Sequence, residues 1–108
     1  MNESYTRYTM QIESTKPLEQ NESEIIVKSE NGLVTLHLPV YWTQPLSLKK
    51  SININIAETV LNKYAMSGIV YHRDENNIYI SCGGLVQTVP LNMYMNLKIG
   101  QKIQIGID

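Results

Sequence analysis

The sequence predicts an all-β protein, built as an antiparallel barrel or sandwich of about seven or eight short strands. Apolar and polar residues alternate with a period of two in three separate stretches, RYTMQIE, SININIA and KIQIGID, which is the pattern of strands with one buried face. Turn-forming residues separate such stretches at the spacing typical of small β domains. Helix-forming character is weak by comparison.

The N-terminal third predicts a strand, a loop and a hairpin. The first strand places Tyr8, Met10 and Ile12 on one side. The polar segment STKPLEQNESE, residues 14–24, is rich in turn-forming residues and is expected to be a loop. EIIVKS and LVTLHL then flank the turn Glu30-Asn31-Gly32, where Asn and Gly adopt positive φ at little cost.

The middle of the chain predicts a further strand and little helix. SININIA sets Ile52, Ile54 and Ile56 against two asparagines. The following AETVLNKYA, residues 57–65, has tolerable helix composition, but its length and β-branched residues allow one turn at most. The four prolines are expected at strand ends or edges, where a missing donor is harmless: Pro17, Pro39, Pro45 and Pro90.

The C-terminal third predicts a second hairpin and two more strands. YAMSGIVYHR and NIYISC are joined by the polar turn Asp74 to Asn77, LVQTVP follows a pair of glycines, and KIQIGID closes the chain. Such a chain of short strands with polar turns predicts a closed or nearly closed β structure.

Size and charge restrict the class of protein. The chain has 108 residues, 43% of them hydrophobic and 18% charged, so residues 1–108 are expected to fold as a single β-barrel domain. A net charge of −1 gives no general attraction to nucleic acid or anionic membranes. One cysteine, no basic-then-apolar leader and no long apolar run favour a cytoplasmic location.

The single cysteine is the first candidate for chemistry. Cys82 would need a base within hydrogen-bond reach, and the chain has two histidines, His37 and His72. Closing the hairpin around residues 74–77 sets His72 about 10 Å from the position opposite Cys82 and on the other face. His37 stays open as a partner, although a solvated or hydrogen-bonded histidine is the simpler interpretation, and Cys82 is then a small buried apolar residue.

Cofactor and metal chemistry have no matching motif. SCGGLV lacks the Lys-Ser/Thr ending of a phosphate-binding loop and does not lead into a helix. Acidic residues at positions 22, 24, 74 and 75 lie in polar turns without ligand spacing. We therefore expect no cofactor and no metal.

The same hairpin register gives the glycines a possible role. It places Gly68 opposite Gly83, on a face ringed by apolar and aromatic side chains where a foreign backbone or ring could approach. The ring consists of Tyr64, Met66, Val70, Tyr79 and Leu85. The opposite face is assigned to the core, namely Ala65, Ile69, Tyr71, Ile78, Ile80, Cys82 and Val86. The alternative is that glycine only lets the strand bend, with Gly84 as a bulge.

Residues 64–86 resemble a known family, the eighth subunit of archaeal and eukaryotic DNA-directed RNA polymerase. That family has a Tyr-x-Met-x-Gly-x-Val-Tyr strand, as in YAMSGIVY, followed by a strand ending in Gly-Gly-Leu, as in IYISCGGL. The order of upstream elements is also similar over most of the chain. Two departures are Cys82, where many relatives have an aromatic residue, and the missing acidic insertion before Tyr64, which makes the chain more similar to the archaeal form.

The resemblance implies both a fold and a function. The fold is an antiparallel barrel of the oligonucleotide/oligosaccharide-binding type, and the function is that of a non-catalytic assembly subunit docked on the largest polymerase subunit near its funnel and pore. The residues carried over to partner binding are Tyr64, Met66, Gly68, Val70, Tyr79, Gly83, Gly84 and Leu85. Sheet edges offer a second way to bind a protein, through backbone hydrogen bonds.

Two other functions stay open. Such barrels also bind single-stranded nucleic acid by stacking bases on aromatic residues in a basic groove. Seven tyrosines and one tryptophan could stack, but the lysines at positions 49, 50, 63, 98 and 102 are scattered. An enzyme built on Cys82 is the least favoured of the three.

Overall fold

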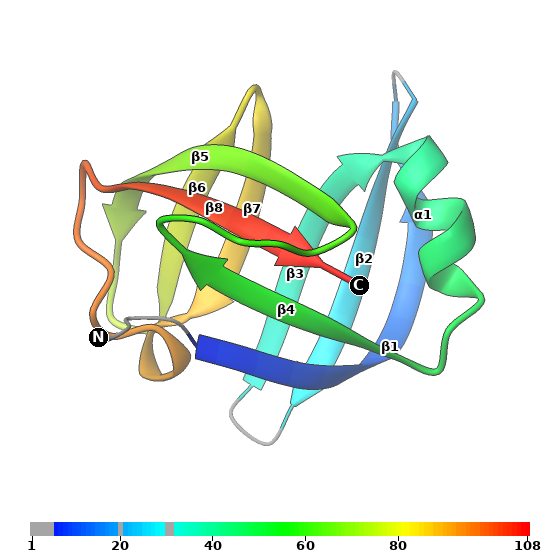
Figure 1. The fold of residues 1–108 in the computed structure, drawn as a ribbon, viewed down its shortest axis with the longest axis horizontal. Helices are drawn as coiled ribbons and strands as arrows, with labels where there is room; N and C mark the ends of the chain where they lie inside the picture. The colour runs from blue at the N-terminus through cyan, green and yellow to red at the C-terminus, as the bar shows by residue number, and fades with distance from the viewer. Residues whose placement is uncertain (1–5, 20, 30–31) are drawn as a thin grey trace.

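The structure is a computed structural model that describes residues 6–19, 21–29 and 32–108. Eight strands form one closed antiparallel barrel, with the strand order β1-β2-β3-β7-β6-β5-β8-β4 (Figure 1). The predicted all-β barrel of seven or eight strands is therefore confirmed. The elements are β1 (Thr6–Pro17), β2 (Glu22–Ser29), β3 (Gly32–Pro39), α1 (Val40–Ser47), β4 (Ser51–Ala57), β5 (Tyr64–Arg73), β6 (Asn77–Cys82), β7 (Leu85–Pro90), a 3₁₀ turn η1 (Leu91–Met93) and β8 (Lys102–Ile107).

Strands β1 and β5 play the same part in the two halves of the barrel. The first half of each strand pairs with a strand distant in the sequence, β4 or β8, and the second half pairs with the next strand along the chain. Each also carries a register shift where it changes partner, between Ile12 and Ser14 in β1 and between Val70 and His72 in β5. Such bulges bend a strand and increase its twist, which lets a long strand turn a corner of the barrel.

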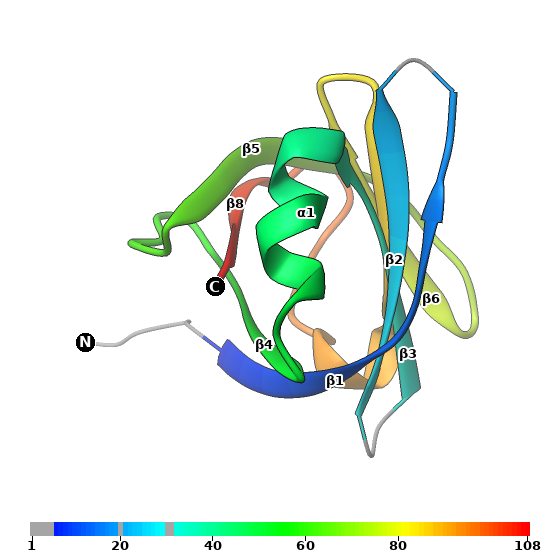
Figure 2. The same ribbon diagram turned by 90° about the vertical axis from the view of Figure 1, so that its right-hand side faces the viewer.

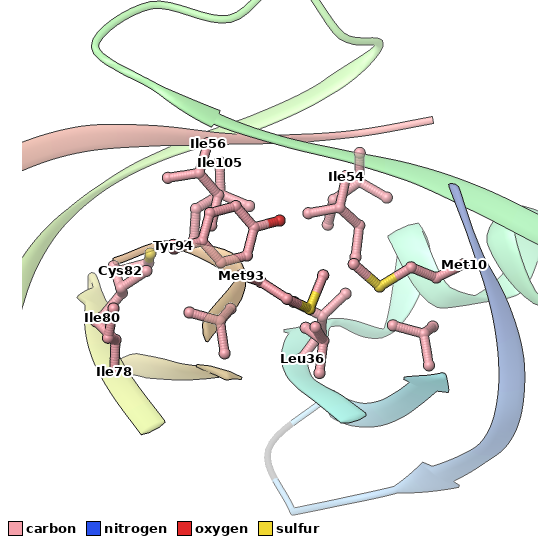
Figure 3. Packing of buried hydrophobic residues seen from close by; sticks show 14 of the residues in the cluster. Met10, Leu36, Ile54, Ile56, Ile78, Ile80, Cys82, Met93, Tyr94 and Ile105 are labelled. Atoms are coloured by element: carbon pink, nitrogen blue, oxygen red, sulfur yellow. The ribbon is translucent and has the colours of Figure 1, made fainter. Parts of the chain in front are cut away.

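The barrel interior is filled by the apolar members of the alternating strands. Side chains from β1, β3, β4 and β8 meet there with Met93 and Tyr94 from the segment after β7 (Figure 3). The predicted inward positions of β4 and β8 are confirmed, because Ile52, Ile54, Ile56, Ile103, Ile105 and Ile107 are all buried. The period of two thus correctly assigns the core face of these two strands.

The closure between β3 and β7 is thin. Their ladder consists of the pair Thr35↔Thr88. Beside this pair, the side-chain amide of Gln87 bonds to the backbone of His37 in the way that a neighbouring strand would. His37 N donates to Gln87 Oε1 at 2.8 Å, and Gln87 Nε2 donates to His37 O at 2.8 Å. Gln87 is fully buried, and this pairing satisfies an amide that would otherwise be costly to bury.

Helix α1 covers one end of the barrel (Figure 2). It buries Thr43 and Leu46, and the Trp42 ring lies 5.3 Å from the ring of Tyr64 on β5. The sequence did not predict this helix, because Pro45 lies inside it and β-branched residues lower its propensity. Tertiary contact stabilises it instead, including a 2.8 Å bond from Val40 N to Asn21 O.

Two further expectations need correction. The segment 14–24 is mostly strand, because β1 continues to Pro17 and β2 begins at Glu22. The possible turn of helix in residues 57–65 is absent from that described segment. Instead, the loop is tied down by side chains: Val60 N donates to Gln104 Oε1 at 2.9 Å, and Asn55 Nδ2 donates to Asn62 Oδ1 at 2.7 Å.

The remaining turn and proline expectations stand as follows. The turn at Glu30 and Asn31 lies outside the described residues, but Ser29 pairs with Gly32 on either side of it. Three prolines end strands β1, β3 and β7, as expected, whereas Pro45 is helical. Among the described residues, no helix has the length and apolar character that a membrane crossing requires.

The hydroxyl group of Tyr94 offers a test of the core packing. The hydroxyl of Tyr94 is buried and has no hydrogen-bond partner among the described residues, and this burial raises the pKa of Tyr94. Tyr8, which packs edge-on against Tyr94 at 5.4 Å, instead donates its hydroxyl to Met93 O at 3.0 Å. Two tyrosines in contact therefore differ in whether their hydroxyl is satisfied.

We expect Tyr94→Phe to raise the free energy of unfolding by about 1 kcal/mol, because it removes a buried donor without a partner. Tyr8→Phe should lower it by a similar amount, because Met93 O loses its donor. Urea denaturation at neutral pH measures both variants. A Tyr94→Phe protein less stable than the parent would contradict the packing described here.

Candidate protein-docking surface

The hairpin of β5 and β6 carries most of the predicted site residues, and its register differs from the prediction in one respect. The turn closes as expected, with His72 opposite Tyr79 and Arg73 opposite Ile78. Beyond it, Tyr71 is an extra residue, because Val70 pairs with Ile80. This bulge shifts the rest of β5 by one position relative to β6.

The shift exchanges the two faces of β5. Gly68 and Val70 are buried, and Tyr64 and Met66 pack against the core. The prediction assigned these four residues to the outer face and is therefore wrong. The residues it assigned to the core from this strand, Ala65, Ile69 and Tyr71, are exposed instead.

On β6 and β7 the assignment is partly right. Ile78, Ile80 and Cys82 are buried, as predicted. The two faces of β7 are reversed, since Gln87 is buried while Val86 is half-exposed. The prediction for β7 treats Cys82 to Leu85 as one continuous strand, whereas the chain reverses direction at Gly83 and Gly84.

The glycines do not face each other. Gly83 and Gly84 have φ values of +60° and +93° and form the two-residue turn that joins Cys82 to its pair Leu85, as expected for a Gly-Gly hairpin. The alternative role of Gly84 as a bulge is also wrong. Gly68 lies against Cys82: a Cβ at residue 68 would come 2.6 Å from Cys82 Sγ and 2.9 Å from Ser81 O.

The predicted apolar depression therefore does not exist. Of the eight residues assigned to partner binding, four lie on the inner side of β5, and four lie on the outer side or at the hairpin tip. The second group consists of Tyr79, Gly83, Gly84 and Leu85. This second group is the part of the predicted site that lies fully on the outside of the barrel.

The bulge instead builds an aromatic cluster on the outer face. Tyr71 and His72 both lie opposite Tyr79, with ring centroids 6.4 Å and 5.2 Å from the Tyr79 ring. We call these three residues the outer aromatic cluster. Bulges often re-aim side chains in this way at functional surfaces.

Asp74 holds the outer aromatic cluster in place. Its carboxylate accepts the backbone N–H groups of Asn76 and Asn77 at 2.8 Å each, and the Tyr79 hydroxyl at 2.9 Å. These bonds, the one from Asn76 first, lower the pKa of Asp74, while donation to that carboxylate raises the pKa of Tyr79. The turn thus fixes the Tyr79 ring and places a negative charge beside it.

Next to this cluster, a groove runs across the outside of β8, β5 and β6. It has a volume of about 440 Å³ and is lined by Glu58, Ser67, Gly68, Ile69, Ser81, Gly83, Lys102, Ile103 and Gln104. Ile69 is 44% exposed and Tyr71 is 48% exposed. We refer to the groove, Ile69 and the outer aromatic cluster together as the β5–β6 outer face.

A larger hollow of about 630 Å³ lies over the thin closure between β3 and β7. It is lined by side chains from the ends of β3 and β7, the β5–β6 turn and η1, including Leu33, Thr35, Asn76, Thr88, Pro90 and Met95. It lacks both the aromatic cluster and the predicted site residues. The β5–β6 outer face is therefore the stronger candidate.

Cys82 and the histidines are not arranged for nucleophilic chemistry. Cys82 is buried beneath Gly68, and burial raises its thiol pKa to about 11. His72 belongs to the outer face, and His37 Nε2 lies 3.1 Å from Glu24 Oε2. The interpretation of Cys82 as a small buried residue, and of His37 as a hydrogen-bonded side chain, is confirmed. No cluster of potential metal ligands occurs within the described ranges.

The lysines do not form a stripe along the barrel. Lys49 Nζ donates to Asp108 O at 2.9 Å, and Lys63 lies over the Tyr64 ring at 5.6 Å. Of the lysines, only Lys102 lines the groove. The positive charge needed to follow a nucleic-acid backbone is not concentrated on this face.

No protein-family model matches the chain, and no curated protein matches it significantly in sequence. The resemblance of residues 64–86 to the polymerase subunit therefore stays a prediction. The Gly-Gly pair did carry a hairpin signal that would have reversed the alternation in β7. The bulge at Tyr71 has no comparable signal, because IVYH is apolar and aromatic on both faces.

We expect Gly68→Ala to lower the free energy of unfolding by about 2 kcal/mol, because the new methyl group would overpack against Cys82 and Ser81. In a Cys82→Ala background the loss should be clearly smaller, since the sulfur is gone. Gly83→Asn is the matched control, because that position is open and Asn tolerates its positive φ. Equal effects of Gly68→Ala in both backgrounds would exclude the contact.

Cys82 should make stability depend on alkaline pH. Its pKa in the folded state, about 11, is above the ordinary 9.0, so the folded protein holds this proton more tightly. The resulting stabilisation is fully present below pH 9 and is lost as the pH rises toward 11. Urea midpoints between pH 8 and 11 should fall more steeply for the parent protein than for Cys82→Ala; parallel curves would refute the assignment.

Proposed function

We propose that this protein is a non-catalytic structural subunit of a DNA-directed RNA polymerase of the archaeal type, and that it docks on the largest subunit through the β5–β6 outer face. The single observation that carries the proposal is the exposure of Ile69 and Tyr71 in the middle of a strand, beside a preformed groove. Both residues belong to the segment that resembles the polymerase subunit.

The composition of this face fits a protein partner. Interface cores are enriched in aromatic and apolar side chains and poor in charge, and hot spots favour tyrosine. Within the outer aromatic cluster, the Tyr79 ring is already anchored by its hydrogen bond to Asp74. A partner would therefore immobilise few side chains on binding, which lowers the entropic cost of association.

A non-catalytic role is supported by the state of the one thiol. Cys82 is buried, its pKa is raised to about 11, and neither His37 nor His72 is placed to activate it. What the barrel offers to a partner is shape and apolar surface. The cytoplasm is the location that follows from this proposed role.

Single-stranded nucleic-acid binding is the second candidate, and the outer aromatic cluster is the observation that favours it. Exposed rings on the surface of a barrel can stack with bases. Two features weigh against it: the Asp74 carboxylate bonded to Tyr79 would repel a phosphate backbone, and the lysines are dispersed. A protein partner therefore remains our proposal.

The test is co-purification from the host with tagged full-length chain. The parent protein should recover the large polymerase subunits, and Ile69→Asp and Tyr71→Asp should each reduce recovery at least tenfold, about 1.4 kcal/mol, because they place a charge in an apolar contact. Leu61→Asp is the matched control, since Leu61 is 95% exposed but lies in the loop before β5. It should leave recovery unchanged.

Thermal melts provide the folding control, and all three variants should melt cooperatively like the parent protein. Recovery of the free chain alone from the parent would refute the polymerase proposal. Tight binding of a fluorescent oligothymidine that weakens steeply with salt would favour the second candidate instead.

A further inference from the structure

Strand β5 is paired unequally along its two edges. On one side it pairs with β8 from Tyr64 to Ile69, while on the other side its ladder with β6 begins only at Ile69↔Ser81. The reason is that β6 ends at Cys82 and the chain turns back through Gly83 and Gly84. Within the described ranges, the first half of β5 has no neighbouring strand on the β6 side.

The hydrogen bonds of Val70 show to which edge of β5 the backbone groups of the preceding residues point. Val70 N donates to Gln101 O at 3.0 Å, and Val70 O accepts Gly100 N at 2.7 Å, on the side of β8. In an antiparallel strand, the backbone N–H and C=O groups of successive residues point to opposite edges. The backbone groups of Gly68 and Met66 therefore also point toward β8. Ala65 and Ser67 therefore direct their N–H and C=O groups to the open edge.

The rest of the barrel leaves this edge uncovered. Trp42 of α1 contacts the ring of Tyr64 at the start of β5. On the far side of the opening, Gln87 bonds to the backbone of His37 on β3, and its Nε2 donates to the Met66 sulfur on β5 at 3.7 Å. This side-chain bond does not involve the backbone of Ala65 or Ser67. Natural proteins usually cover, charge or shorten such an edge, yet Ala65 and Ser67 are small, uncharged and exposed.

We propose that an extended segment of a partner protein pairs with β5 along Ala65 to Ser67 and adds a short strand to the barrel. This inference rests on the proposed function, because it gives the protein partner a mode of attachment. The alternating donors and acceptors of a polypeptide match this edge, whereas a nucleic-acid backbone offers no such ladder.

The surroundings favour a strand at this place. The groove is lined by Ser67 of the open edge and by Gly83 of the hairpin tip, so edge and groove are continuous. A side chain on the outer face of the added strand would pass over small neighbours and enter the groove beside Ile69. The three-residue edge sets the length of the paired segment at about three to five residues.

The first test is residue-resolved hydrogen exchange of isotopically labelled chain, alone and after assembly into the host polymerase, read by NMR after quenching and dissociation. In the free chain, the amides of Ala65 and Ser67 should exchange quickly, while those of Met66 and Gly68 are protected by β8. In the complex, Ala65 and Ser67 should slow at least a hundredfold. No gain at these two amides would overturn the added strand.

The second test uses proline. Ala65→Pro removes a donor that the barrel does not use, so it should fold and yet reduce co-purification at least tenfold. The matched control, Met66→Pro, removes a donor directed to β8 and should melt at a clearly lower temperature. Ile69→Asp, which tests the outer face, separates the two proposals.

Each outcome has a definite meaning. Loss of recovery with both Ala65→Pro and Ile69→Asp supports the added strand. Loss with Ile69→Asp alone overturns it and leaves the polymerase proposal intact, whereas free parent chain overturns both. A dimer of the isolated chain with slow exchange at Ala65 and Ser67 would mean that the edge pairs with a second copy, and would also overturn it.

Discussion

One extra residue in β5 decides which side of this barrel faces outward. The pleat of a strand sends alternate side chains to opposite faces, so the bulge at Tyr71 inverts the direction of every residue from Tyr64 to Val70 relative to a regular hairpin. Gly68 is thereby placed against Cys82, while Ile69 and Tyr71 reach the surface. The close packing at Gly68 and the apolar outer face are thus two results of the same local event.

The bulge in β5 is matched by a shift in β1, and together they explain how two groups of sequentially adjacent strands become a closed barrel. Each long strand leaves its distant partner and joins its local hairpin where the register changes. The extra residues supply the bend that closure needs. The unpaired edge at Ala65 and Ser67 lies just before this change of partner, where β5 pairs with β8 but has not yet joined its hairpin with β6.

The sequence predicts regular strands well and irregular positions poorly. The isoleucines of β4 and β8 could be assigned to the core from alternation alone, because one face of those strands is apolar and the other is not. In β5 both faces are apolar or aromatic around Ile69 to Tyr71, so alternation cannot locate an added residue. Helix α1 was missed because its local propensity is low, and contacts such as Trp42 with Tyr64 override that propensity. For the candidate site, the sequence therefore predicted which residues form the hairpin better than the face of the sheet on which each side chain lies.

The Gln87 amide also has a consequence for the order in which the barrel assembles. The strands β1–β2–β3 and β5–β6–β7 are each contiguous in sequence, so each meander can form from short-range contacts, and the join between them is a long-range step. At that join only Thr35 and Thr88 must find their register, because a flexible side chain reaches His37 and completes the closure. Closure between the two meanders thereby requires the alignment of one pair of threonines, while β4 and β8 join the meanders through longer ladders of their own.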